Sequence, residues 1–152
     1  MCEVNLLINN KYDKIKALKQ MDQCDKKHKY LTVKNKIYSK YFEVAESDLV
    51  KAYTELENDD SFWALEKLQS SVTMFLYGLS IKKKGLLPGS YVCCENLIIA
   101  LELISENQYN VIDSIRDKRN ENMYNAIKRM DLSILDVEEL CEKFKKRMGE
   151  FS

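Results

Sequence analysis

Residues 61–85 read SFWALEKLQSSVTMFLYGLSIKKKG, and this stretch decides the fold class. Its apolar residues recur every three or four positions, which gives an α-helix a wide apolar face. These residues are Phe62, Leu65, Leu68, Val72, Phe75, Leu76 and Leu79. Asp60 or Ser61 suits the N-cap, and Gly85, after three lysines, suits the C-terminal end. The pattern predicts a helix at the centre of a bundle.

The same periodicity continues on both sides of this helix. Other predicted helices lie at about 42–56, 109–127 and 134–148, and a weaker apolar stripe runs from Val4 to Met21. A further helix is predicted after the segment Leu86–Ser90, with Leu97, Ile98, Leu101 and Ile104 buried. The lysine-rich stretch 25–40 is either a linker or the start of the next helix. Leu86–Ser90 is the one strong loop signal, because it contains the only proline.

Composition supports an all-α protein. The chain has 152 residues, with only one proline and four glycines, and both residue types disfavour helices. The 24 basic and 24 acidic side chains cancel, so no global field attracts nucleic acid or an acidic membrane. We therefore predict an antiparallel bundle of five to six helices, formed by residues 41–152. Residues 1–40 are expected to form an N-terminal helical extension.

Targeting and cysteine signals predict a cytoplasmic protein. The N-terminus lacks the pattern of a signal peptide, and no apolar run is long enough for a membrane span. The five cysteines are an odd number without a C-x-x-C pair, which is typical of reduced thiols rather than a disulfide framework. With a single histidine and no glycine-rich phosphate loop, we expect neither a metal nor a cofactor.

The segment Ser114–Tyr124 carries the most informative polar pattern. At helical spacing, Arg116, Arg119, Asn120 and Tyr124 are expected to share one face. A guanidinium offers phosphate a fixed fork of donors, and a tyrosine ring stacks on a base. This face is therefore a candidate site for a nucleotide or RNA. The alternative is an ordinary arginine-rich helix surface with intrahelical pairs.

Three segments resemble the HEPN domain family. Ala45–Ala52 and Asp59–Lys67 resemble its opening helix, acidic turn and second helix, and Gly85 resembles the glycine that ends that helix. Arg119-Asn120-Glu121-Asn122-Met123-Tyr124 is similar to the family's R-N-x-x-x-H motif. The resemblance implies a helical homodimer with arginine motifs facing each other across the interface. Active members are metal-independent ribonucleases, and others bind nucleotides or partner a minimal nucleotidyltransferase.

The sequence departs from the catalytic motif at its histidine. Tyr124 stands there, and a phenol with a pKa near 10 is only about 0.1% ionised at neutral pH. In a second register, Arg116 and Asn122 take the arginine and histidine positions, and an amide is no base either. His28 from a partner subunit is a further candidate, although its lysine-rich surroundings are typical of a solvated surface.

These observations favour a binding protein over an enzyme. The leading hypothesis is binding of RNA, a nucleotide or a protein partner, such as a nucleotidyltransferase, at a homodimer interface. The alternatives are a ribonuclease with a divergent base, for which Arg119 and Tyr124 are the catalytic candidates, and a helical scaffold or inhibitor without a ligand site.

Overall fold

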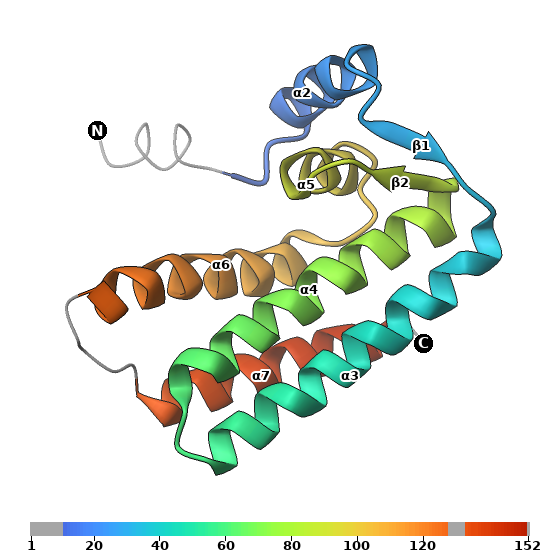
Figure 1. Ribbon diagram of the computed structural model, residues 1–152. Helices are drawn as coiled ribbons and strands as arrows, with labels where there is room; N and C mark the ends of the chain where they lie inside the picture. Colours follow the sequence, from blue (N-terminus) through green and yellow to red (C-terminus); the bar gives the residue numbers. More distant parts are fainter. Residues whose placement is uncertain (1–10, 128–132, 152) are drawn as a thin grey trace, which may run out of the picture.

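The computed structural model describes residues 11–127 and 133–151, which form an all-α helical bundle as predicted (Figure 1). The described elements are α2 (Lys14–Lys26), β1 (Tyr30–Thr32), the 3-10 helix η1 (Asn35–Ile37), α3 (Tyr38–Glu57), α4 (Ser61–Lys84), β2 (Leu86–Pro88), α5 (Tyr91–Ala100), α6 (Glu106–Ile127) and α7 (Ile134–Gly149). No helix within these residues is both long and apolar enough to cross a membrane.

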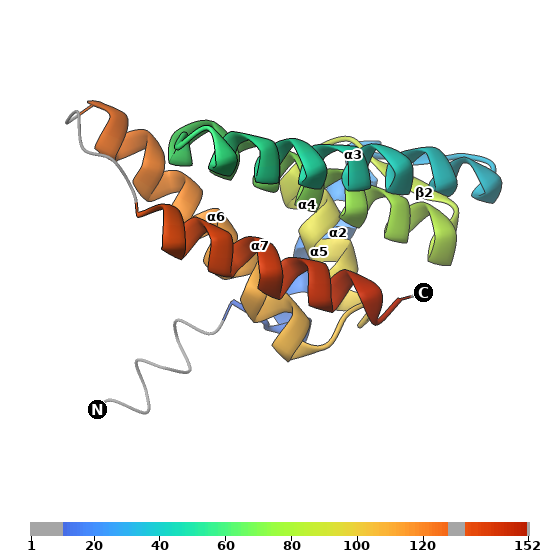
Figure 2. The ribbon, with the colours of Figure 1, turned by 90° about the horizontal axis from the view of Figure 1, so that it is seen from below.

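Helix α4 is the centre of the bundle, as its sequence predicts. It contacts α3, α5, α6 and α7, and it pairs most extensively with α3, to which a tight turn joins it. Figure 2 shows α3 and α4 as one layer, with α7 crossing it on one side. Burial of Leu65, Leu68, Val72, Leu76 and Leu79 explains this position, because four helices together surround the apolar face.

Both ends of α4 follow the predicted capping chemistry. The Asp60 side chain accepts a hydrogen bond from the backbone N–H of Trp63 at 3.0 Å. Gly85 adopts a φ of 67°, and its N–H donates to the carbonyl of Ile81 at 2.7 Å. A glycine takes this left-handed conformation without steric cost, so it ends the helix cleanly.

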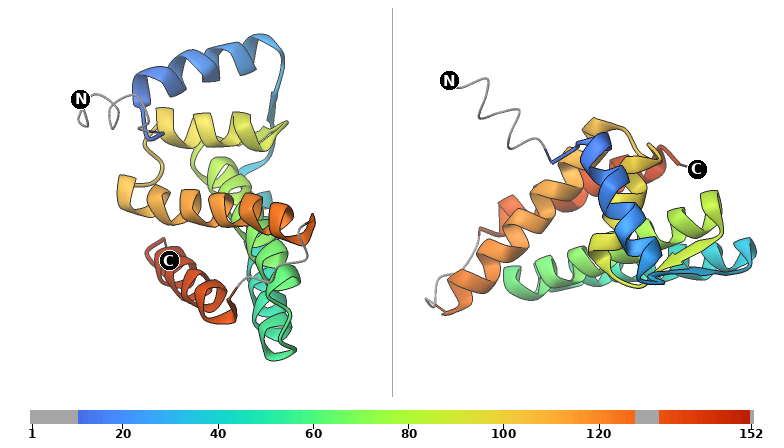
Figure 3. Two further views of the ribbon diagram at one scale, coloured as in Figure 1. Left: turned by 90° about the vertical axis from the view of Figure 1, so that its left-hand side faces the viewer. Right: turned by 90° about the horizontal axis from the view of Figure 1, so that it is seen from above.

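The first described helix lies on α5 and does not extend away from the bundle. In Figure 3 (left), α2, α5 and α6 form successive layers. Helix α2 begins at Lys14, after the Asp13 N-cap, and continues to Lys26, five residues beyond the predicted end at Met21. The predicted start at Val4 lies outside the described residues. The apolar pattern does not predict the last turns of α2, because only two side chains of this helix, Ala17 and Cys24, are buried and most of the others are polar.

A disulfide joins Cys24 of α2 to Cys93 of α5, so the prediction of reduced thiols is wrong for this pair. The two residues are 69 positions apart, and their Cα atoms come within 6.0 Å because α2 packs on α5. An odd cysteine count does not exclude one bond. Cys94 and Cys141 are free and buried, and Cys2 lies outside the described residues.

The stretch 25–40 contains the start of the next helix, because α3 begins at Tyr38, but the residues before it are more than a simple linker. Its residues 30–32 form β1, which pairs antiparallel with β2, with Leu31 opposite Leu87. The pairing joins segments more than fifty residues apart, and each strand has three residues. Local periodicity does not reveal so short a strand. The two-stranded β1–β2 pairing holds the segment that connects α2 to α3 against the C-terminal end of α4 (Figure 1).

The Tyr30 hydroxyl provides a prediction for alkaline pH. It donates to the carbonyl of Cys93 at 2.8 Å, and burial raises the pKa of Tyr30 to about 12 from its ordinary value of 10.0. Since the folded state favours the protonated phenol, its contribution to stability is complete below pH 10.0 and is lost as the pH rises to about 12. We expect the free energy of unfolding to fall less steeply across this window in Tyr30→Phe, measured by urea titration at each pH. An unchanged slope, matching that of Tyr38→Phe, would contradict this expectation.

Candidate functional site

Arg116 is held in a polar network between α5 and α6. Its Nη1 donates to both oxygens of Glu95, at 2.7 Å and 2.5 Å, and its Nη2 donates to Asp113. The Tyr109 hydroxyl donates to the same Glu95 carboxylate. Only 26% of the Arg116 side chain and 12% of the Glu95 side chain are exposed. Both guanidinium edges of Arg116 that a phosphate would use are therefore occupied by carboxylates.

The network also fixes the charge states of its members. Burial lowers the pKa of Arg116, but the neighbouring Glu95 carboxylate outweighs this effect and raises it overall. Burial and the hydrogen bond to Glu95 raise the pKa of Tyr109. A charged guanidinium and a neutral phenol, both directed at one carboxylate, are a structural tie between α5 and α6 rather than an open ligand site.

Arg119 lies one turn further along α6 and makes a looser contact. Its Nε lies 3.4 Å from each oxygen of Glu66 on α4, and 40% of its side chain is exposed. Its terminal nitrogens make no hydrogen bond with any residue of 11–127 or 133–151. The Glu66 carboxylate thus positions the guanidinium through one edge and leaves the other edge for a ligand.

The remaining residues of the predicted face lie on the solvent side of α6. Asn120 and Tyr124 are exposed, and 59% of the tyrosine is accessible. Asn122 instead points inward and is only 3% exposed, and its side-chain nitrogen donates to the carbonyl of Phe62 at 3.2 Å. In the second sequence register, the residue at the histidine position is therefore a helix-packing amide. The four predicted site residues therefore divide into two sets: Arg116, which is half-buried and held by carboxylates, and Arg119, Asn120 and Tyr124, which are more accessible.

Trp63 is the residue that sequence reasoning missed. It is 53% exposed on the first turn of α4, and its ring packs edge-on against Phe62 at 5.2 Å. The contacts from Asn122 to Phe62 and from Arg119 to Glu66 place this turn beside residues 119–122 of α6. One signal was available in the sequence, because Trp63 does not belong to the apolar stripe of α4. An exposed indole on the turn of α4 that contacts this part of α6 suits a flat ligand.

His28 lies far from Arg119 in the same chain. It is exposed at the turn between α2 and β1, with a φ of 56°, and the following strand pairs with β2 beyond the C-terminal end of α4. Arg119 contacts the N-terminal part of α4, and a 24-residue helix is about 36 Å long. Within one subunit, His28 therefore takes no part in chemistry at Arg119.

The described residues contain no group of three or more His, Cys, Asp or Glu side chains placed to hold a metal ion. The free thiols do not suit nucleophilic chemistry either. Burial raises the pKa of Cys141 to about 12 and that of Cys94 well above its ordinary value, so both remain protonated at neutral pH.

The fold and this site define the class of molecule as an all-α bundle with an accessible arginine and indole at one end. Comparisons with models of protein families, with curated proteins and with solved structures give no significant match.

Proposed function

We propose that this protein is a HEPN-like helical protein that binds the phosphate of single-stranded RNA or of a nucleotide at Arg119, without cleaving it. One observation carries the proposal: Glu66 holds the Nε edge of Arg119 and leaves its terminal nitrogens available, on the part of α6 that contacts the first turns of α4, where Trp63 is exposed. A guanidinium binds phosphate through two parallel hydrogen bonds, and an indole ring stacks on a base.

The lack of an imidazole supports binding without cleavage. Tyr124, at the position of the motif's histidine, is exposed on α6 and offers a phenol instead of an imidazole. A ribonuclease needs a group that accepts a proton from the attacking hydroxyl. Arg119 stabilises a phosphate but does not accept that proton, and His28 lies at the far end of α4.

Trp63 provides a direct readout, because it is the only tryptophan in the chain. We expect single-stranded oligoadenylate to quench its fluorescence, and Arg119→Ala to weaken binding about tenfold through the loss of charged hydrogen bonds. A parallel titration with adenosine monophosphate separates binding of the free nucleotide from binding of RNA. Raising the salt concentration is expected to weaken binding, less steeply in the variant.

Arg147→Ala is the matched control, since this half-buried arginine on α7 forms its ion pair within the described residues with nearby Glu150 at 2.7 Å. It is expected to bind as the wild type does. Equal affinity of wild type and Arg119→Ala would contradict the proposal. Gel analysis of the same RNA after incubation tests whether the protein leaves it uncleaved. RNA fragments that disappear in Arg119→Ala and Tyr124→Phe would instead establish a ribonuclease.

The proposal includes a homodimer that uses the same end of the molecule, with a nucleotidyltransferase-like protein as the alternative partner. The exposed apolar side chains of Trp63, Met123 and Tyr124 support an interface there. Light scattering of wild type and Arg119→Glu tests it. A dimer that dissociates on charge reversal would agree with a shared site, and a monomer in both would remove the two-subunit site.

A further inference from the structure

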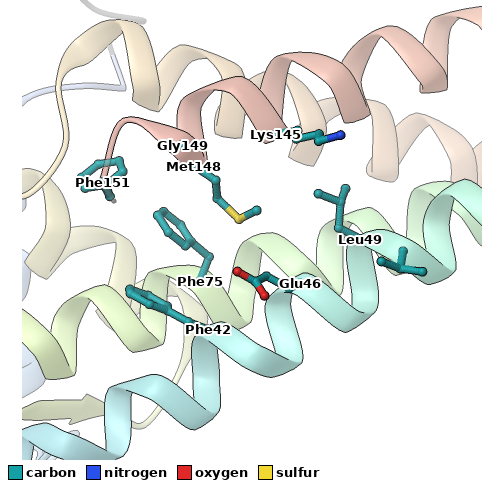
Figure 4. A pocket seen from close by; sticks show the side chains of 9 residues that line it. Phe42, Glu46, Leu49, Phe75, Lys145, Met148, Gly149 and Phe151 are labelled. Carbon is teal, nitrogen blue, oxygen red and sulfur yellow. The ribbon is translucent and has the colours of Figure 1, made fainter.

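A cavity lies between α3 and α7, and none of its lining residues belongs to the Arg119 site (Figure 4). Its volume is about 480 Å³, within the range of small-molecule sites. Apolar side chains form most of its wall: Phe42, Leu49, Val50, Phe75, Met148 and Phe151. We call this space the α3–α7 cavity.

Three phenyl rings define one end of the α3–α7 cavity. The rings of Phe42 and Phe75 stack at 5.3 Å, and Phe151 meets Phe75 edge-on at 5.4 Å. Phe42 is fixed from behind, because a Cβ at Gly78 would lie only 2.6 Å from its ring atoms. The aromatic wall is therefore built into the packing of α3 on α4.

Glu46 is the acidic side chain among the residues that line this apolar space. Figure 4 shows its carboxylate between Phe75 and Leu49, directed from α3 toward the cavity. It makes no hydrogen bond or ion pair with another residue of the described chain. A carboxylate beside aromatic rings is a recognition element for a cation, because ring faces and carboxylate oxygens both attract positive charge.

Lys145 lines the opposite wall on α7, but its ammonium is engaged elsewhere. Its Nζ lies 5.8 Å from the centroid of the Tyr53 ring, and Figure 4 shows the amine directed away from Phe75. Glu46 is therefore not neutralised by this lysine. The charge that a ligand in the α3–α7 cavity meets first is negative.

We infer that the α3–α7 cavity binds a small amphiphilic amine, with its apolar body against the phenyl rings and its ammonium group on Glu46. The apolar lining favours burial of a hydrocarbon or aromatic body, at roughly 25 cal/mol per Å² of apolar surface. The carboxylate selects the charge of the head group. This inference is independent of the function proposed for Arg119.

The test uses three probes with the same alkyl chain and different head groups: decyltrimethylammonium, decanoate and decanol, each below its micelle concentration. Calorimetric titration of the full chain is expected to show the ammonium probe binding about tenfold more tightly than decanoate. Glu46→Gln should remove this preference for the ammonium head group, but the variant should still bind the alkyl chain of each probe. Glu43→Gln, an exposed carboxylate one turn away on the same helix, should leave the preference unchanged.

Met148→Trp, which fills the α3–α7 cavity, should abolish binding of all three probes while the circular dichroism spectrum stays unchanged. Equal affinity for the three head groups, or an unchanged preference in Glu46→Gln, would overturn the assignment of Glu46. Tighter binding of decanoate would identify Lys145 as the charged partner instead, and no binding of any probe would overturn the site itself.

Discussion

Loss of the disulfide between Cys24 and Cys93 is expected to lower the free energy of unfolding by about 2–4 kcal/mol. The bond closes a loop of 69 positions, and it anchors a helix in which only Ala17 and Cys24 are buried. Without the bond, α2 is held by its packing on α5 and by the short β1–β2 ribbon that follows it in the chain. We therefore expect the change to appear first as local opening of α2, measured by hydrogen exchange, and then in urea titrations of Cys24→Ser.

A reducing agent supplies the internal control for this prediction. Under reduction, each wild-type disulfide gains two electrons and two protons, and the wild type should become as unstable as Cys24→Ser. The variant itself should not respond. The bond is verified separately by mass spectrometry without reduction, where tryptic peptide 20–26 should be joined to 85–116. Equal stability of oxidised and reduced wild type would contradict the expected role.

The parts of the fold that local chemistry determines were predictable from the sequence. Asp60 and Gly85 mark the two ends of α4, because capping depends on a few adjacent residues. The start of α6 at Glu106, three residues before the predicted start at 109, uses the same chemistry, because Ser105 and Gln108 exchange side-chain-to-backbone hydrogen bonds at 3.2 Å and 2.7 Å. The β1–β2 pairing and the disulfide depend on contacts between distant segments, and no local pattern encodes them.

The candidate site shows the same limit at the level of single residues. Arg116 and Arg119 lie one turn apart on α6, and the sequence treats them as equivalent. Their roles differ because Glu95 on α5 and Asp113 each accept from one terminal nitrogen of Arg116, whereas Glu66 on α4 takes only one edge of Arg119. Which carboxylate meets which arginine is decided by tertiary packing. Trp63 was missed for the same reason, because its exposure follows from where α6 lies.

Glu95→Ala is expected to cost about 2–4 kcal/mol of the free energy of unfolding, because it breaks a largely buried ion pair. The substitution removes the carboxylate that accepts hydrogen bonds from both Arg116 and Tyr109. The buried Tyr109 hydroxyl and the Nη1 edge of Arg116 then lose this acceptor. Urea titration at neutral pH measures the loss. Glu139→Ala, which breaks an exposed pair with Lys143, should change stability by less than about 0.5 kcal/mol.

A double variant separates the structural role of this pair from ligand binding. Glu95→Leu with Arg116→Met replaces the two charges by apolar side chains of similar size, and such exchanges are often neutral for stability. We expect this variant to recover most of the stability lost in Glu95→Ala. Since Arg119 is unchanged in it, the Trp63 fluorescence titration should give wild-type affinity for oligoadenylate. A refolded double variant that no longer binds the RNA would show that Arg116 contacts the ligand, and it would move the phosphate site to the α5–α6 side of the helix.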